Sequence, residues 1–349
     1  MKHLLPLFAL LSGMSPLAVA ADPAVVTSEF IFETNPVPSC HATTIAETPA
    51  GLVAAWFAGT AEGKPDVAVW TARQIDGRWT APEKVADGAP HPCWNPVLFQ
   101  PSKGPLLLFY KVGPSPRAWW GMLKSSADEG KTWTAATRLP EGFLGPIKNK
   151  PIELASGVLI CPSSTESEAK PSAWRAHFEM TPDLGQTWTM AKPASHGEPG
   201  IDAIQPSILQ PGGENLVALG RTRQKRLFRV ESPDLGRTWG AMTLLDLPNP
   251  NSGTDALTLK DGRHVLIYNH TERGRSPLNV AVSADGQTWR AALILEDEPK
   301  AEFSYPAVIQ TRDGMIHFTY TWKRKLAKHV VVNPAKLTLR PIVDGKWPE

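Results

Sequence analysis

The stretch SADEGKTW at residues 126–133 recurs along this chain and decides its fold. Close copies are TPDLGQTW at 181–188 and SPDLGRTW at 232–239, and a copy one residue shorter, SADGQTW, lies at 283–289. A degenerate copy, DGRW, precedes them at 76–79. The tryptophans of the five copies lie 54, 55, 51 and 50 residues apart. This spacing is the length of a four-stranded propeller blade.

Each copy, called a box below, has the residues of a tight turn between two strands. Ser, Thr and Asp side chains satisfy backbone donors in such a turn, Gly takes a positive φ, and Trp packs its ring beneath the turn. A reaction centre does not recur four times around a ring. We therefore assign structural roles to the box aspartates, which are Asp128, Asp183, Asp234 and Asp285.

The composition agrees with many short strands joined by turns. The chain has 349 residues, of which 42% are hydrophobic, and its 27 glycines and 34 prolines disfavour long helices. Its formal net charge is only +2, so no overall field draws the surface to nucleic acid or to anionic lipid. Partners must therefore be sought at a local site.

A second repeat counts the blades. Six segments share the pattern of an apolar strand, a turn and an apolar strand, which predicts an all-β fold, a six-bladed β-propeller with these boxes in its turns. The first strand of each blade lines the central channel, so the residue that enters it points into the mouth of a funnel. These six residues are His41, Asn95, Lys150, Gln205, Asp255 and Tyr305.

Polar residues follow the second strand of each blade and return to the same face. They include Asp66 after the first blade, Arg221 and Arg223 after the fourth, and Arg275 after the fifth. Guanidinium groups pair bidentately with carboxylates. A positively charged rim on an otherwise nearly neutral chain therefore indicates an anionic sugar as the ligand.

On its boxes and their spacing, the chain resembles the Asp-box (BNR-repeat) sialidase superfamily of six-bladed propellers, over roughly residues 25–345. The resemblance implies that Tyr305 is the nucleophile and that Asp66 is the acid–base. It also implies that Arg221 and Arg275 are the second and third of three arginines that hold the substrate carboxylate. A phenol needs a neighbouring group that removes its proton before it becomes a useful nucleophile.

Two positions depart from the family pattern. His41 stands where the first arginine of the triad is expected, and Gln205 stands at the position of the glutamate that assists the tyrosine. Glutamine cannot act as a base, which leaves Asp255 or Glu302 to substitute from nearby. We therefore expect a divergent relative that acts on another acidic sugar of a glycan rather than a standard sialidase.

Three functions are compatible with these residues. The first is a glycoside hydrolase that uses Tyr305 and Asp66. The second is a uronate lyase, for which His41 and Tyr305 supply base and acid while arginine and Asn95 neutralise the carboxylate. The third is a sugar-binding propeller without catalysis, with tryptophans exposed for stacking at Trp94, Trp119, Trp120, Trp174 and Trp322. None of the three requires a cofactor or a metal.

The first 20 residues read as a secretory signal peptide, with Lys2, an apolar run and Ala18-Val19-Ala20 before the cleavage point. The propeller then occupies residues 21–349, and we expect a periplasmic or secreted protein without a membrane span. Three cysteines allow at most one bridge. Cys40 and Cys93 enter equivalent strands of neighbouring blades, so they form either a disulfide or, with Cys161, three buried thiols. The sequence does not indicate the sugar, the linkage or the oligomeric state.

Overall fold

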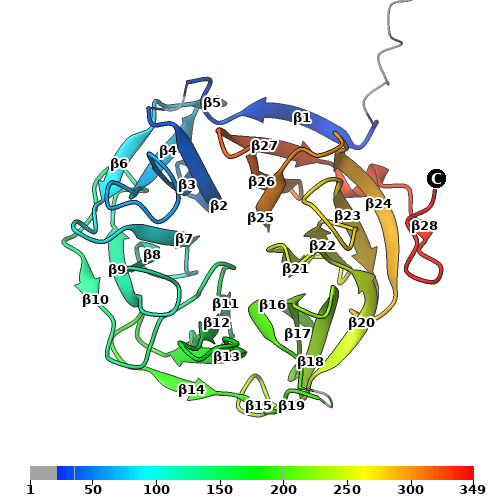
Figure 1. The fold of residues 1–349 in the computed structure, drawn as a ribbon. Helices are drawn as coiled ribbons and strands as arrows, with labels where there is room; N and C mark the ends of the chain where they lie inside the picture. Colours follow the sequence, from blue (N-terminus) through cyan, green and yellow to red (C-terminus); the bar gives the residue numbers. More distant parts are fainter. Residues whose placement is uncertain (1–21, 35, 198–199) are drawn as a thin grey trace, which may run out of the picture.

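Six antiparallel sheets stand around a central axis in the computed structural model, which describes residues 22–34, 36–197 and 200–349 (Figure 1). No α-helix occurs in these residues, and their one helical segment is the 3-10 turn η1 (Pro334–Lys336). The predicted all-β, six-bladed propeller is therefore confirmed. The signal peptide predicted at residues 1–20 lies outside the described residues.

The first three blades follow one another along the chain. Blade one contains β2 (Ser39–Thr48), β3 (Gly51–Gly59), β4 (Ala68–Ile75), β5 (Arg78–Trp79) and β6 (Glu83–Ala86). Blade two contains β7 (Cys93–Phe99), β8 (Leu106–Val112), β9 (Trp120–Ser126) and β10 (Thr137–Arg138). Blade three contains β11 (Ile152–Glu153), β12 (Leu159–Glu166), β13 (Trp174–Thr181) and β14 (Thr189–Ala191).

The other three blades complete the circle. Blade four contains β16 (Ala203–Gly212), β17 (Asn215–Thr222), β18 (Arg226–Ser232) and β20 (Thr243–Pro248). Blade five contains β21 (Asp255–Thr258), β22 (His264–Tyr268), β23 (Leu278–Ser283), β24 (Trp289–Glu296) and the late strand β28 (Arg340–Pro341). Blade six contains β25 (Phe303–Gln310), β26 (Ile316–Trp322), β27 (Leu326–Val332) and β1 (Val25–Phe30). A parallel pair, β15 (Pro193–Ser195) and β19 (Trp239–Ala241), joins blades three and four at the rim.

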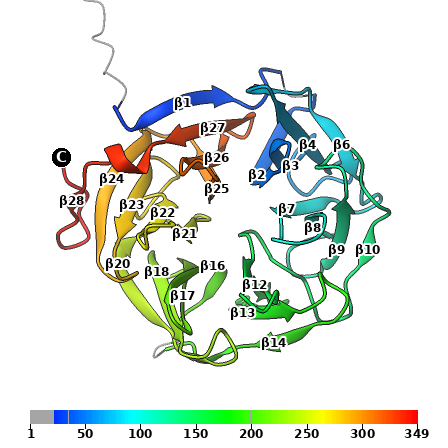
Figure 2. The ribbon, with the colours of Figure 1, turned by 180° about the vertical axis from the view of Figure 1, so that it is seen from behind.

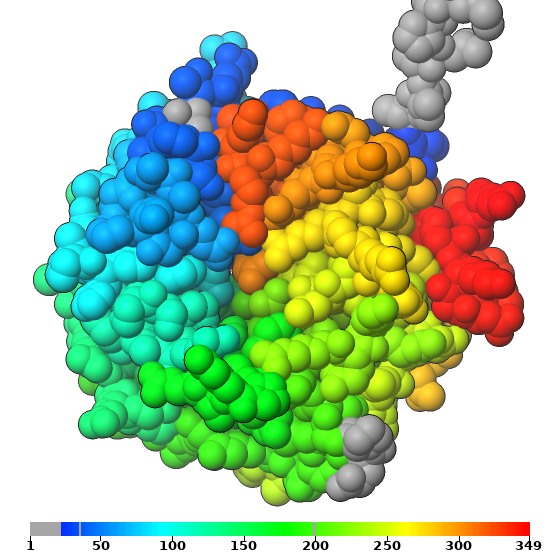
Figure 3. All heavy atoms as spheres, in the orientation of Figure 1, coloured from blue at the N-terminus to red at the C-terminus, as the bar shows by residue number. Residues whose placement is uncertain are grey.

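The ring is closed by its two ends. Strand β1 pairs antiparallel with β27, in the register Ser28↔Val330, and so becomes the outermost strand of blade six (Figure 2). In the space-filling view the first sector and the last lie side by side (Figure 3). Nothing in residues 25–30 resembles a box, and their partner lies at the other end of the chain. The sequence therefore does not predict a strand there.

The apolar core lies between neighbouring blades. One buried cluster joins Val265 and Val280 of blade five to Phe318 and Val330 of blade six, and another joins Val53 of blade one to Leu108 of blade two. Each blade thus buries both faces. Both faces must therefore be apolar, as expected for a continuous ring of packed sheets.

The boxes are hairpin clamps, as predicted. In the box at 126–133, the Thr132 amide and hydroxyl both donate to Asp128, at 2.8 and 2.6 Å, and the Gly130 amide donates to the Ser126 hydroxyl at 2.7 Å. The same bonds form at Asp183 and Asp234. Two consecutive residues take left-handed backbone, such as Glu129 at φ 62° and Gly130 at φ 85°. The turn is thus closed by its own side chains.

The box tryptophans are not equally buried. Trp239 is 3% exposed and stacks on Phe178 with ring centroids 3.6 Å apart, and Trp289 is 4% exposed. Trp188 is only half-buried, although the turn it belongs to has the same hydrogen bonds. Trp79 and Trp133 are likewise only partly buried, so the expectation that the ring packs beneath its turn holds fully only at Trp239 and Trp289, because the packing depends on the neighbouring blade and not on the motif.

Four inner strands carry a bulge where they begin. Their register shifts at a non-glycine residue with left-handed backbone, at Ala42 (φ 56°), Asn95 (φ 31°), Gln205 (φ 56°) and Tyr305 (φ 51°). Such residues are strained, and they cluster at functional sites. The equivalent of Tyr305 in blade one is therefore Ala42, and the predicted ring is wrong by one residue at His41.

Cys40, Cys93 and Cys161 are all buried free thiols, so the disulfide that the sequence left open does not form. Burial raises the pKa of both Cys40 and Cys93 to about 12, which keeps these thiols protonated. Within the described residues, no helix is long and apolar enough to cross a membrane.

Candidate active site

The hydroxyl of Tyr305 lies against a guanidinium at the mouth of the funnel. Arg221 donates from Nη2 to Tyr305 Oη at 3.1 Å and from Nη1 to the Asn251 carbonyl at 3.2 Å. Because arginine has no acceptor, the phenol oxygen must accept this bond. The arrangement stabilises negative charge on the phenol oxygen. Tyr305 is 8% exposed and Arg221 is 6% exposed.

Three basic groups surround the ring of Tyr305. The guanidinium carbons of Arg221 and Arg275 lie 5.3 and 5.6 Å from its centroid, and Lys148 Nζ lies 5.7 Å away. The three cations come from blades four and five and from the chain just before blade three. The permanent charges of the two guanidiniums favour an anion at the funnel mouth; that the ligand is an acidic sugar stays a prediction.

His41 packs on the other side of the tyrosine, with ring centroids 4.1 Å apart. Its Nδ1 shares a hydrogen bond of 2.9 Å with the Thr321 hydroxyl, whereas Nε2 is buried without a hydrogen-bond partner in the described structure. Burial, together with the charges of Arg324 and Arg275, lowers the pKa of His41 well below its ordinary value. The imidazole is therefore neutral at neutral pH and has one free nitrogen.

Glu302 does not serve the tyrosine. Its carboxylate receives Arg275 at 2.8 Å and Arg324 at 2.6 Å, and it also accepts from the Ser304 hydroxyl at 2.8 Å. Arg324 donates in turn to Glu62 at 2.6 Å. Burial alone would raise the pKa of Glu302, but the two guanidiniums hold it below its ordinary value. All three donors meet Oε1 of Glu302, and no hydrogen bond joins Glu302 to Tyr305 in the described structure, so the suggestion that Glu302 replaces the missing base is not supported.

Lys150 and Asp255 pair with each other and not with Tyr305. Lys150 Nζ lies 2.9 Å from Asp255 Oδ2, and Asp255 also accepts from the Ser207 hydroxyl and the Val308 amide at 2.9 Å. Asp255 is 1% exposed and ties blades three to six together. Two of the six predicted ring residues thus support the channel and do not line its mouth.

Gln205 does lie beside the tyrosine. A Cβ on Gly253 would meet both Tyr305 Cδ2 at 3.2 Å and Gln205 Oε1 at 3.4 Å, so both side chains crowd this glycine. The amide oxygen of Gln205 is buried without a hydrogen-bond partner among the described residues. Asn95 is buried at the equivalent bulge of blade two.

Asp66 lies on the loop after β3, next to Val67, which belongs to the buried cluster of Ala42, Phe57 and Tyr305. Its own side chain is exposed and accepts from the Thr60 amide at 2.8 Å and from the Thr60 hydroxyl. The Thr60 hydroxyl lowers the pKa of Asp66. The structure thus brings the loop to the tyrosine while the carboxylate faces its own turn.

The sequence predicted Lys150 as the residue of blade three at the funnel mouth, but the lysine beside Tyr305 is Lys148. The Lys148 ammonium donates to Asn149 Oδ1 at 2.8 Å, to the Thr254 carbonyl at 3.0 Å and to the Pro306 carbonyl at 2.5 Å. Burial lowers its pKa to about 7. Both lysines precede the same inner strand, and nothing in their spacing shows which one reaches the axis.

Two of the tryptophans predicted to be exposed are buried. Trp94 and Trp174 are each 7% exposed, while Trp119, Trp120 and Trp322 are partly exposed. The Trp94 indole donates to the Gly113 carbonyl at 2.8 Å, and the Trp174 ring is covered by Arg223, whose guanidinium carbon lies 4.2 Å from the centroid. A stacking surface for sugars can therefore use only the other three.

Known proteins share this fold. The sequence profile of the BNR repeat-like domain family matches residues 50–318. No curated protein sequence matches the chain. A Dyadobacter fermentans protein of unknown function has 18% identity and a TM-score of 0.73, with 89% of this chain and 99% of that chain covered.

Two enzymes of known structure are similar as well. The NanB sialidase of Streptococcus pneumoniae has 12% identity and a TM-score of 0.72, with 89% of this chain and 71% of that chain covered. The intramolecular trans-sialidase of Ruminococcus gnavus has 15% identity and a TM-score of 0.72, with 91% and 100% covered. At these identities the likeness concerns the fold, and on that level the resemblance to sialidases is confirmed.

Proposed function

Since this chain belongs to the BNR repeat-like domain family and has a sialidase-like fold, we propose that it is a glycoside hydrolase acting on an acidic sugar of a glycan. The observation that carries the proposal is the contact between Tyr305 Oη and the Arg221 guanidinium at the funnel mouth. A tyrosine in this position has a stabiliser for its phenolate and a neighbouring field for an anionic substrate. The fold alone does not assign the activity.

In the proposed reaction, Tyr305 Oη attacks the anomeric carbon and the bond from that carbon to the leaving oxygen breaks. The phenol proton passes to solvent, and the leaving oxygen takes a proton from Asp66. Water then attacks the anomeric carbon of the tyrosine-linked sugar, gives a proton to the Asp66 carboxylate and releases the phenolate, which takes a proton back from solvent. Arg221 stabilises the phenolate at both ends of this sequence.

The sugar carboxylate is assigned to Arg221 and Arg275. These two differ in their surroundings, because Glu302 already offsets the charge of Arg275 whereas Arg221 makes no ion pair in the described structure. Arg221 should therefore contribute more to the recognition of charge. His41 takes the place of a third arginine and supplies packing against the tyrosine rather than charge.

The lowered pKa of Asp66 makes the protonated form scarce at neutral pH. A proton donor of this kind works better as the pH falls, so turnover should increase toward acid pH until the protein itself loses stability. Asp66→Asn should abolish this increase in turnover toward acid pH. A profile that falls toward acid pH would remove Asp66 from the mechanism.

A uronate lyase is the second candidate, and the free Nε2 of His41 is the observation that favours it. A neutral imidazole beside Tyr305 is able to take the proton next to the uronate carboxylate. The bond from the adjacent carbon to the leaving oxygen then breaks, a carbon–carbon double bond forms, and the Tyr305 hydroxyl returns a proton to the leaving oxygen.

One experiment separates the candidates. The protein is incubated with a panel of acidic oligosaccharides, and mass spectrometry shows whether products carry added water or a double bond. A fluorinated substrate analogue should leave a covalent adduct on Tyr305 only for the hydrolase, and His41→Ala should abolish turnover only for the lyase. Binding without either product would leave a sugar-binding propeller and contradict both enzyme proposals.

We also propose that residues 1–20 direct export and are removed. The N-terminus of the mature protein, determined by sequencing after expression in a Gram-negative host, should begin at Ala21, and the protein should be recovered outside the cytoplasm. An intact Met1 in a cytoplasmic fraction would contradict this proposal.

A further inference from the structure

A second pocket lies on the same face as Tyr305, between blades two and three. It is enclosed by the loop 113–119 that joins β8 to β9, by the segment 138–144 after β10 and by the end of β12. The inner strands begin on this face and the second strands end on it, so the pocket opens beside the funnel mouth. Its volume is about 230 Å³. This is below the range usual for drug-sized ligands and suits a single ring.

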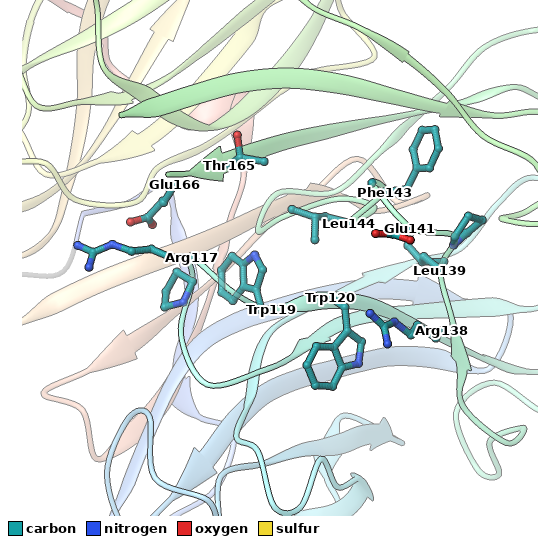
Figure 4. A pocket seen from close by; sticks show the side chains of 13 residues that line it. Arg117, Trp119, Trp120, Arg138, Leu139, Glu141, Phe143, Leu144, Thr165 and Glu166 are labelled. Atoms are coloured by element: carbon teal, nitrogen blue, oxygen red, sulfur yellow. The ribbon is translucent and has the colours of Figure 1, made fainter. Parts of the chain in front are cut away.

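Its lining combines aromatic rings with unpaired charges. Trp119 and Trp120 are both partly exposed in it, and Arg117, Arg138, Glu141 and Glu166 surround them (Figure 4). Arg138 covers the Trp120 ring at 4.8 Å, which leaves Trp119 as the open aromatic surface. None of the four charged side chains makes an ion pair with another described residue. Donors and acceptors are thus both available for hydroxyl groups.

Two chains of contacts join this pocket to the candidate active site. Trp119 packs edge-on against Trp94 at 6.0 Å between centroids, and Trp94 in turn packs against Phe57 at 6.2 Å, beside His41. On the other side, Glu166 accepts from the Trp174 indole at 3.1 Å, and the Trp174 ring lies 5.4 Å from the Arg221 guanidinium. The pocket is therefore separated from the Tyr305 site by the buried rings of Trp94 and Phe57 on one side and by the buried ring of Trp174 on the other.

We propose that this pocket binds an uncharged sugar unit of the same glycan whose acidic unit lies at Tyr305, an inference that rests on the proposed function. Two arginines and two glutamates balance, so the pocket does not select a carboxylate as the funnel mouth does. An aromatic face with hydroxyl-binding groups around it selects a sugar ring. The protein then recognises a chain of sugars and not one terminal unit.

The test is electrophoresis in native gels that contain a neutral polysaccharide, which is galactan, arabinan, xylan or mannan. Gels with the acidic polymer polygalacturonate are run for comparison, and gels without polysaccharide are the reference. At least one polymer should retard the wild-type protein. Trp119→Ala should weaken that retardation roughly tenfold, the effect of losing about 1.4 kcal/mol of stacking. Arg117→Ala, at an exposed position, should weaken it a few-fold. Trp322→Ala is the matched control, since Trp322 is a partly exposed tryptophan of the same face that lies on blade six.

The outcomes distinguish this pocket from the reaction centre. Tyr305→Phe should lose turnover and keep the retardation, which supports the pocket, and retardation without any detectable turnover would refute the hydrolase while retaining a sugar site. No retardation by any neutral polymer overturns the proposal, and so does full retardation of both Trp119→Ala and Arg117→Ala. Retardation only in polygalacturonate gels, lost in Arg221→Ala, would assign all binding to the funnel mouth and also overturn it.

Discussion

The two ends of the blade strands differ in how far their side chains repeat from blade to blade. At the box end, Asp128, Asp183 and Asp234 make the same bonds to a threonine four residues later, and every turn is closed within itself. At the funnel mouth each blade contributes a different side chain, and the buried atoms Arg221 Nε, Gln205 Oε1 and His41 Nε2 have no hydrogen-bond partner in the described structure. Buried polar groups are normally paired. Two box tryptophans, Trp133 and Trp289, also leave their indole nitrogen unpaired, so it is the repetition of side chains that marks the scaffold and their variation that marks the site.

The strongest test of this comparison removes one oxygen atom at the funnel mouth. Tyr305→Phe should reduce turnover by roughly 10²–10⁴-fold, the contribution of a positioned proton-transfer or nucleophilic group. The fold should persist, because among the described residues the hydroxyl bonds only to Arg221. Steady-state rates and a thermal melt measure both effects.

The matched control changes a polar group at the other end. Asp183→Asn should retain turnover in whatever protein folds, because its carboxylate bonds within its own turn. Normal folding with lost turnover in Asp183→Asn, or full activity in Tyr305→Phe, would reverse the assignment of the two ends.

Substitutions at the box end should instead change the stability of the protein. Trp239→Ala should cost about 3–5 kcal/mol of unfolding free energy, as for other buried aromatic residues, because its ring is covered by Phe178. Trp188→Ala should cost clearly less, since the ring is half-buried. Urea denaturation of the two variants gives the difference, and equal losses would show that the motif rather than its neighbours sets the packing.

The mouth should also discriminate charge. Arg221→Ala should weaken the binding of an acidic ligand by roughly 1.5–3 kcal/mol, the value of a hydrogen bond to a charged group. Arg275→Ala should have a smaller effect, because Glu302 already offsets its charge. Calorimetric titration with an acidic sugar and its neutral analogue provides the measurement, and equal losses for the two ligands would indicate general damage to the site.

The smallest expected effect is on the stability of the protein at acid pH. The pKa of Asp285 is lowered to about 2, mainly by backbone donors of its turn that outweigh its burial. Its contribution to stability is therefore complete above the unfolded value near 4 and is lost as the pH falls from there toward 2. Asp285→Asn should be less stable near neutral pH and should lose less on acidification.

Melting temperatures of both proteins between pH 2 and 5 test this prediction. His317, whose pKa burial lowers to about 4, destabilises both proteins in acid and cancels in the comparison. A steeper acid loss in Asp285→Asn than in the wild type would contradict the structural role of the box.

The features that could be predicted from the sequence are those that a short, local residue pattern determines. The boxes and their spacing give the fold and six blades, and Tyr305 and Arg221 come from positions that a strand start and a strand end define. The bulge that makes Ala42, and not His41, the equivalent of Tyr305 could not be foreseen, because it depends on the pairing between β2 and β3. The roles of Glu302 and Lys148 also depend on loops that are distant in sequence. Which carboxylate meets which guanidinium is decided by tertiary structure alone.

The closure of blade six by β1 has a consequence for how the molecule is made. Glu29 of β1 bonds to His329, 300 residues later, and to the Trp79 indole of blade one at 2.9 Å. Contacts between such remote positions raise the contact order, which slows folding because a long loop must close before they form. During synthesis the first strand has no partner until β27 leaves the ribosome. The earlier blades can pack in order, but the ring acquires its full cooperativity only with its last strand.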